Sequence, residues 1–199
     1  MQNKKPVADL RVRRTRKLIQ RALIELTIEK GFTTITVQDL AERAMVNRAT
    51  FYRHYTDKYD LLKHYMDEIY EMTTSQEPLP KAAQRMPNEI QPPGGMVQML
   101  EQVRAHADFF RVMLSDQGDP AFAQRIQQYS ESRLRTLMPN KPRKSQPNEP
   151  PLDLCLSYLS YAGVGGIVWW LQQKQTVSPE QIAQWLNQLA MATFAQVMR

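Results

Sequence analysis

The ten residues 46–55, VNRATFYRHY, combine hydrogen-bond donors with aromatic rings and contain only one large aliphatic residue. Arg48 and Arg53 each present a planar fork of N–H donors, which matches two acceptors placed side by side. Further hydroxyl and imidazole donors follow at Thr50, Tyr52 and His54. The stretch is too polar for a protein core and too aromatic for an ordinary solvated face. Its chemistry is recognition through hydrogen bonds.

The positive charge of the chain is concentrated near its N-terminal end. The net charge is +6 over 199 residues. Residues 1–63 contain 14 Lys+Arg and 7 Asp+Glu, a balance of +7, whereas residues 64–199 have a balance of −1. A basic third beside a neutral remainder is typical of a protein that meets a polyanion at one end. The alternative is a solvated basic arm, and charge alone does not decide between the two.

Helix signals before the donor stretch indicate two helices. Apolar residues at helical spacing occupy residues 12–29, and Gly31 is the kind of residue that follows a helix end. A second, short helix begins with a capping box of Thr36 and Asp39. It ends at a turn over residues 44–46.

The donor stretch itself is predicted to form the third helix. Asn47 is a good N-cap, and we expect the helix to run to about Tyr55. Three short helices with a tight turn between the second and third have the layout of a helix-turn-helix. At about 100° per residue, Phe51 and Tyr55 face the core, while Ala49 and Arg53 lie nearly opposite.

This outward face is suited to a DNA major groove. Arg53 or Arg48 can bind guanine O6 and N7, and Ala49 can contact a thymine methyl. Three other side chains can donate to phosphates on the groove walls: Thr50, Tyr52 and His54.

Lys58 stands in the first turn of a fourth helix that Asp57 can cap. A cation there opposes the helix dipole, by about 0.3–1 kcal/mol, unless an anion occupies that end of the helix. We therefore expect Lys58 to bind a phosphate. The alternative is a solvated lysine balanced by Asp57 and Asp60.

The segment AERAMVNRATFYRHYTDKYDLL, with the preceding Gly-Phe and TTITVQDLA, resembles the DNA-binding domain of tetracycline-repressor (TetR) family regulators over residues 12–62. The Gly-Phe, T-x-x-D-L-A and T-F-Y-x-x-Y motifs and the lysine that follows all keep the same register. Met45 stands where the family usually has glycine, which costs up to about 1 kcal/mol if its φ is positive. The resemblance implies base contacts by Gln38, Arg48, Ala49 and Arg53. It implies phosphate contacts by Thr36, Thr50, Tyr52, His54 and Lys58.

The rest of the chain also reads as helical. Helices are expected over residues 96–115, with a bend near His106, and over residues 120–138, 152–174 and 179–198. Proline-rich stretches interrupt them at residues 75–95 and 139–151, and the second is expected to be a mobile loop. The predicted fold is all-α with about nine helices. Residues 1–62 form the helix-turn-helix domain with a basic arm, and residues 63–199 form a helical regulatory and dimerisation domain.

The helix expected over residues 152–174 is apolar on two sides, which predicts burial against its own domain and against another partner. One face repeats at a/d spacing: Leu152, Leu156, Leu159, Gly163, Gly166 and Trp170. The other face contains Leu154, Tyr158, Tyr161, Gly165 and Val168. The GxxGIVWWL and SPEQIAQWL motifs resemble the last two helices of one TetR subgroup, which typically form a two-fold interface. The resemblance implies a homodimer with these residues at its interface: Gly163, Gly166, Trp170, Trp185 and Leu189.

The resemblance also implies a small-molecule effector in the C-terminal domain. The candidate lining is apolar and aromatic: Met99, Val103, Phe109, Phe110, Met113, Phe122, Ile126, Tyr129 and Tyr161. For each residue alone, ordinary core packing is the simpler explanation.

Other function classes find little support. The sequence has no Gly-rich phosphate loop, paired carboxylates in apolar context or metal-ligand cluster, so we expect no enzyme, cofactor or metal. The single Cys155 and a start without an apolar signal region favour a cytoplasmic protein. Residues 154–171 lack charge, but their serines, glycines and tyrosines favour a buried helix over a membrane span.

The predicted function is therefore a sequence-specific DNA-binding regulator. By resemblance it is a homodimeric, ligand-responsive repressor on a palindromic operator. The alternative is a co-regulator whose C-terminal domain binds a protein partner. The sequence does not give the operator, the effector, the target genes or the sign of regulation.

Overall fold

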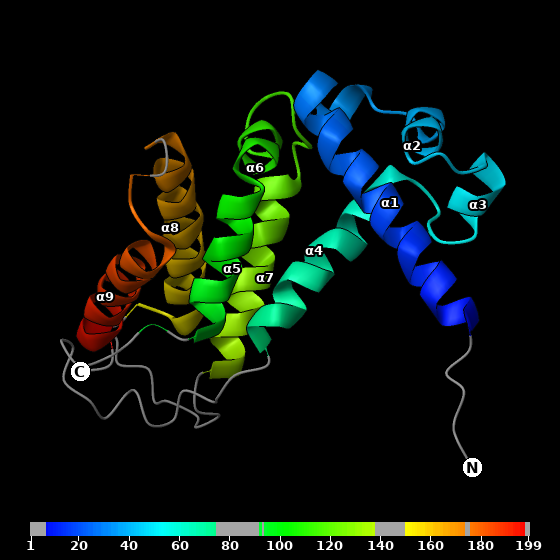
Figure 1. The fold of residues 1–199 in the computed structure, drawn as a ribbon. Coiled ribbons are helices and arrows are strands. Elements are labelled where there is room, and N and C mark those ends of the chain that lie inside the picture. The colour runs from blue at the N-terminus through cyan, green and yellow to red at the C-terminus, as the bar shows by residue number, and fades with distance from the viewer. Residues whose placement is uncertain (1–6, 75–91, 93, 138–149, 174–175, 198–199) are drawn as a thin grey trace, which may run out of the picture. The chain divides into compact units, whose positions relative to one another are not determined.

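The computed structural model describes residues 7–74, 92, 94–137, 150–173 and 176–197. Over these residues the chain is all-helical, as Figure 1 shows, with nine α-helices and one 3₁₀ turn. In chain order they are α1 (Val7–Lys30), η1 (Phe32–Thr34), α2 (Val37–Arg43), α3 (Arg48–Tyr52), α4 (Lys58–Thr74), α5 (Gly94–Ala105), α6 (Ala107–Met113), α7 (Phe122–Leu137), α8 (Leu152–Gln172) and α9 (Pro179–Val197). The predicted all-α fold class is confirmed.

The predicted helices are present, and their ends differ in informative ways. α1 begins five residues before its apolar pattern. α3 ends at Tyr52 rather than Tyr55, because its last turn tightens: the N–H of His54 donates to the carbonyl of Phe51 at 2.9 Å. The predicted bend at His106 is a break between α5 and α6. The predicted loops over residues 75–95 and 139–151 lie largely outside the described residues.

By the contacts within it, the chain divides into two compact units. The first contains Met1–Tyr70 and Asp108–Asp119. Its core joins the apolar face of α1 to the short helices and to α4. The side chains that this core buries completely include Ile19, Leu23, Phe32, Leu40, Phe51, Leu61 and Leu62.

The second unit contains Glu71–Ala107 and Pro120–Arg199. Within it α7 packs on α8, and α9 packs on both α5 and α8. Its most deeply buried side chains include Leu100, Phe122, Leu156, Trp170 and Ala183.

The two faces of α8 are the reverse of the sequence prediction. Trp170 is only 1% exposed, and its indole N–H donates to the carbonyl of Val177 at 2.8 Å. A Cβ at Gly166 would collide with the side chain of Leu186 in α9. Both residues therefore pack within one chain, on the face of α8 that was predicted to lie at an intermolecular interface. A Cβ at Gly163 would meet nothing within 4 Å.

The opposite face of α8 is the exposed one. Leu154, Tyr158 and Tyr161 are 59%, 61% and 55% exposed. Tyr161, a candidate for the effector pocket, is therefore exposed within this unit. Tyr129, 39% exposed, is likewise not enclosed there.

By length and composition, α8 is the one helix of the described residues that is apolar enough to cross a membrane. The most apolar 18-residue window of α8 has a mean hydropathy of 1.4, and 33% of that window is buried inside the protein. One such helix is weak evidence for a membrane span, and α8 packs on α7 and α9 within the protein.

Candidate nucleic-acid interface

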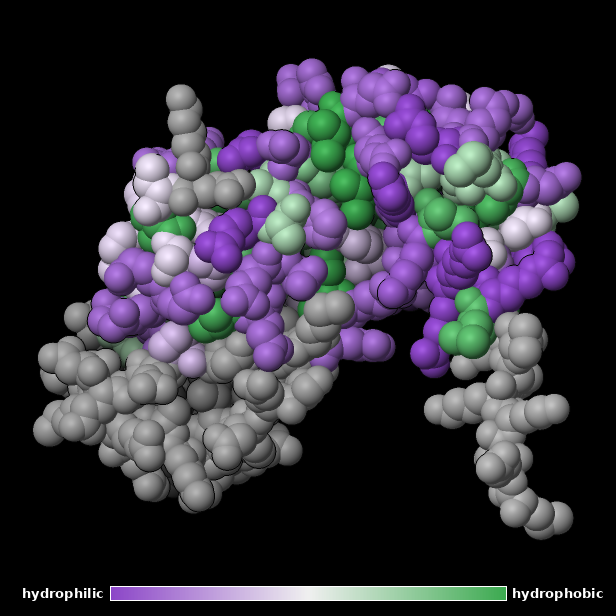
Figure 2. All heavy atoms as spheres, in the orientation of Figure 1, coloured by the Kyte–Doolittle hydropathy of each residue, from purple (hydrophilic) through white to green (hydrophobic). Residues whose placement is uncertain are grey.

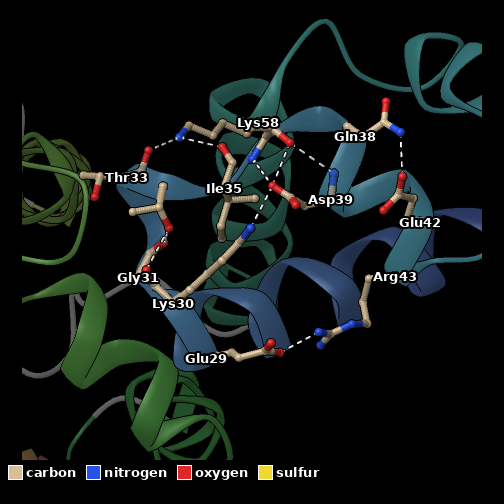
Figure 3. Close-up of polar contacts among 12 residues, drawn as sticks. Glu29, Lys30, Gly31, Thr33, Ile35, Gln38, Asp39, Glu42, Arg43 and Lys58 are labelled. Carbon is tan, nitrogen blue, oxygen red and sulfur yellow. Dashed lines mark hydrogen bonds and ion pairs between the residues drawn. The ribbon is translucent and has the colours of Figure 1, made fainter.

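The entry into α2 is fixed by a capping box and an ion pair, shown in Figure 3. The hydroxyl of Thr36 accepts from the N–H of Asp39 at 3.2 Å, and the Asp39 carboxylate accepts from the N–H of Thr36 at 2.7 Å. Lys30 of α1 lies 2.9 Å from the same carboxylate. The Thr36 hydroxyl and then Lys30 hold the pKa of Asp39 well below its usual range. α2 is thereby fixed to the end of α1.

The turn between α2 and α3 passes through a left-handed residue. Met45 has φ 52°, and its side chain is 87% exposed. The next N–H, of Val46, closes the turn on the carbonyl of Ala41 at 2.9 Å. A side chain at such a φ raises the free energy of the fold by about 1 kcal/mol. This strain was predicted from the sequence, because Met45 stands where TetR regulators usually have glycine.

α3 is positioned by its cap and by its buried aromatics. The side chain of Asn47 accepts from the N–H of Ala49 at 2.9 Å, as predicted. Phe51 and Tyr55 are 0% and 3% exposed, so they anchor the helix in the core. The opposite side chains are exposed: Arg48, Ala49, Tyr52 and Arg53. The predicted division of α3 into two faces is confirmed.

Hydrogen bonds along α3 orient its two arginines. The guanidinium of Arg48 donates to the hydroxyl of Tyr52 at 3.1 Å and lies 5.5 Å from the centre of that ring. The guanidinium of Arg53 donates to the hydroxyl of Thr50 at 2.8 Å. A guanidinium has five N–H donors, so each arginine keeps donors for a partner outside the protein.

His54 follows α3 and is half-buried. Burial and the nearby cations Arg16 and Arg53 lower its pKa, so the neutral imidazole is favoured in the free protein. Arg16 belongs to α1, which places the N-terminal half of α1 within electrostatic reach of the end of α3. Arg16 was not among the predicted DNA-binding residues, although it lies in a basic run with Arg13, Arg14 and Lys17.

Lys58 is not a free phosphate donor. Its ammonium lies 3.0, 2.9 and 2.9 Å from the carbonyl oxygens of Phe32, Thr33 and Ile35. These bonds use all three N–H donors of the ammonium. Burial lowers the pKa of Lys58. Lys58 thus fastens the η1 turn to the start of α4, and a phosphate contact by Lys58 would have to replace one of these bonds.

The two α2 candidates also have partners within the protein. The hydroxyl of Thr36 donates to Asp39 at 2.6 Å, so its proton is not available to a phosphate without breaking the capping box. The amide of Gln38 donates to the carboxylate of Glu42. The side chain of Gln38 is nevertheless exposed, and its amide oxygen remains available as an acceptor.

Two matches to known families cover most of the chain. Residues 19–65 match the family described as bacterial regulatory proteins, tetR family. Residues 91–192, half of the chain, match a TetR-type transcriptional regulator C-terminal region. The chain belongs to the TetR family. It is a DNA-binding transcriptional regulator of a non-enzymatic family.

Two relatives from Bacillus subtilis (strain 168) are similar to short parts of the chain. The uncharacterized HTH-type transcriptional regulator YxbF is 41% identical over 56 residues, 28% of this chain and 15% of that protein. The uncharacterized HTH-type transcriptional regulator YdeS is 38% identical over 66 residues, 33% of this chain and 32% of that protein. The chain thus spans less than a third of either relative.

Solved structures of TetR regulators share the fold over nearly the whole chain. A TetR regulator from Streptococcus agalactiae 2603V is 27% identical with a TM-score of 0.60, over 92% of this chain and 97% of that one. The activator DhaS of a dihydroxyacetone kinase operon is 16% identical, with a TM-score of 0.58 over 92% of this chain and 96% of that one. NalD of Pseudomonas aeruginosa is 17% identical, with a TM-score of 0.57 over 91% and 96%. The last two similarities concern the fold alone.

The described residues contain no group of three or more acidic, His or Cys side chains that can hold a metal ion. Cys155 is buried and not in a disulfide.

Proposed function

We propose that this TetR regulator acts in the cytoplasm as a homodimer that reads a palindromic DNA site through the outward face of α3. The observation that carries the proposal is the pair of exposed arginines, Arg48 and Arg53, each oriented by a neighbouring hydroxyl. A guanidinium held in place loses less entropy when it binds the two acceptors of guanine. Ala49 between them leaves room for a thymine methyl group.

Phosphate contacts complete the interface on either side of these bases. Thr50, Tyr52 and His54 offer donors at the edge of α3. Gln38 lies on α2 and offers an amide to a base or a phosphate. Phosphate contacts set the position of the helix on the duplex, whereas the arginines provide sequence preference.

The dimer surface that we propose is the exposed apolar face of α8 and α9. Trp169 and Trp185 are 44% and 39% exposed, and their ring centres lie 6.4 Å apart in an edge-on arrangement. Leu189 on α9 is 67% exposed. Apolar side chains gathered on one surface mark an interaction site. A second copy of the chain fits because a two-fold axis presents the same apolar face twice.

A two-fold dimer determines the kind of DNA site. Its two recognition helices enter successive major grooves about 34–36 Å apart, so the half-sites form a palindrome with that separation. An exposed apolar face can also receive another protein, which is the co-regulator alternative. Intact donors on α3 favour DNA binding in either case.

We further propose that a small, largely apolar effector controls release from DNA, and that the protein is a repressor, the commonest behaviour in the family. Within the second unit, Val103, Phe122 and Ile126 are buried apolar candidates, and Met99 is partly buried. The other buried candidates, Phe109, Phe110 and Met113, belong to the first unit. The effector acts only if it binds the non-DNA-binding conformer more tightly than the DNA-binding one.

The experiment is selection of duplexes from a random DNA pool at near-physiological salt. The parent protein is run beside Arg53→Ala, with Arg111→Ala as a control on α6. We expect the parent and the control to enrich one palindrome and Arg53→Ala to lose preference at one position per half-site. Absence of any enriched sequence with the parent would overturn the proposed function.

A further inference from the structure

The cations of α1 fall into two groups along the helix. In the C-terminal half each one has an acidic partner: Arg21 lies 2.7 Å from Glu25, and Lys30 lies 2.9 Å from Asp39. Arg43 of α2 adds ion pairs to Glu25 and Glu29. This half of α1 is electrically balanced by the protein itself.

The N-terminal half of α1 is different. Four of its exposed cations make no ion pair with any residue that the structure describes: Arg11, Arg14, Arg16 and Lys17. Arg11 and Arg14, and again Arg14 and Lys17, stand three residues apart, which places like charges beside each other on the helix. Such spacing destabilises an isolated helix. A polyanion bound along this half would remove that repulsion.

The position of these cations identifies the polyanion. Burial and then the charge of Arg16 lower the pKa of His54, so this charge acts on the residue that directly follows the C-cap of α3. Figure 2 shows strongly hydrophilic side chains over the N-terminal half of α1 on the face in view, beside the helix-turn-helix. A duplex held by α3 continues past this region, and its backbone carries phosphates at every step.

We propose that Arg11, Arg14, Arg16 and Lys17 form a second DNA-binding surface, which contacts phosphates flanking the bases that α3 reads. The inference rests on the proposed DNA reading by α3. The contacts are independent of sequence, because phosphates are the same at every base pair. They increase affinity and salt dependence, and they make affinity depend on the length of the duplex.

The test combines charge removal with duplex length. One variant carries Arg14→Gln, Arg16→Gln and Lys17→Gln together. The matched control is Arg21→Gln, which removes an equally exposed arginine from the same helix two turns beyond Arg14, but one already paired with Glu25. The selected palindrome is used once with about ten flanking base pairs on each side and once without flanks.

On the long duplex we expect the triple variant to bind at least tenfold more weakly. We expect its salt slope to fall by about 2.7 per half-site, since each of the three lost phosphate contacts lowers the slope by about 0.9. On the short duplex the parent and the triple variant should differ by less than threefold. Arg21→Gln should follow the parent on both duplexes.

Two results would overturn the inference while leaving the proposed function intact. One is equal weakening of the triple variant on long and short duplexes. The other is a loss on the long duplex no greater than that of Arg21→Gln. By contrast, a parent protein that selects no duplex at all would contradict the proposed function itself.

Discussion

The ammonium nitrogen of Lys58 lies 2.9 Å from the carbonyl oxygen of Ile35, the residue directly before the cap of α2. It also binds the carbonyls of Phe32 and Thr33 and lies 4.9 Å from the centre of the Phe32 ring. One side chain from α4 thus holds the segment from which α2 begins. The position of α2 therefore depends on this contact.

Lys58→Met therefore tests structural support against phosphate binding. The change leaves three carbonyls without their donor, and we expect a loss of about 1–3 kcal/mol of folding free energy in urea unfolding. Affinity for DNA should fall on every sequence, but the salt slope should stay that of the parent. Lys63→Met, on an exposed position of the same helix, is the control and should leave stability unchanged. A salt slope lowered by about one per half-site would restore the phosphate role.

The strained turn predicts a stabilising substitution. Met45→Gly removes a side chain at φ 52° that is 87% exposed, so no packing is lost. Glycine adopts this φ without strain but adds freedom to the unfolded chain, and we expect a net gain of about 0.5–1 kcal/mol. The measurement is the midpoint of urea unfolding. Ala44→Gly is the control, since Ala44 has φ −76° and is buried, and it should destabilise the protein. Equal effects at both positions would show that the turn is not strained.

His54 predicts a pH dependence of DNA binding. In the free protein burial, Arg16 and Arg53 lower its pKa below 6.5. A phosphate placed beside it in the complex favours the imidazolium and raises that pKa again. Binding then takes up a proton, so affinity should rise as pH falls through the region below 6.5, by at most about tenfold per pH unit and half-site.

The lowered pKa of His54 gives folding stability the opposite pH dependence from DNA affinity. Because the pKa of His54 is lowered in the folded state, its contribution to stability is present above pH 6.5 and is lost as pH falls below that value.

The affinity for DNA should be measured by titration at pH 5.5–7.5 with the parent and His54→Gln. The variant keeps His64 and His106 as internal controls. A pH slope unchanged in His54→Gln would exclude His54 from the phosphate contacts.

The apolar face of α8 and α9 predicts dimerisation through Leu189. Leu189→Glu places a charge on a side chain that is 67% exposed in the single chain, so the fold should tolerate it. In a two-fold interface the change brings two carboxylates into an apolar surface, and we expect the dimer dissociation constant to rise at least tenfold. Sedimentation equilibrium measures this. Ile28→Glu, at an exposed apolar position of α1, should leave the dimer unchanged. Parent protein that is monomeric at micromolar concentration would contradict the dimer.

The sequence predicted the features that depend on neighbours along the chain. The capping box of Thr36 and Asp39, the Asn47 cap and the Asp57 cap each involve residues two or three positions apart, and all are present. The division of α3 into a core face and an outward face follows from helical periodicity in the same way.

The structure differs from the sequence predictions mainly in contacts between residues that are distant along the chain. The partners of Lys58 lie 23–26 residues away, so no local pattern distinguishes a bound ammonium from a free one. In α8 the apolar residues surround the helix, and periodicity therefore does not tell which side faces the same chain. Trp169 and Trp170 are adjacent in sequence, yet one is 44% and the other 1% exposed. Contacts outside α8, such as the hydrogen bond of the Trp170 indole to the carbonyl of Val177, distinguish the two.

The most direct test of the central claim, that the outward face of α3 reads bases, is a cycle of protein and base-pair substitutions at Arg53. Affinities of the parent and Arg53→Ala are measured for the selected palindrome and for duplexes with one base pair changed symmetrically in each half-site. At one position we expect the base-pair change to cost the parent about 1–3 kcal/mol of binding free energy per half-site and to cost Arg53→Ala no further binding free energy. Arg48→Ala should show the same at another position. If Arg53→Ala loses as much as the parent at every position, α3 does not read bases through Arg53, and the claim is contradicted.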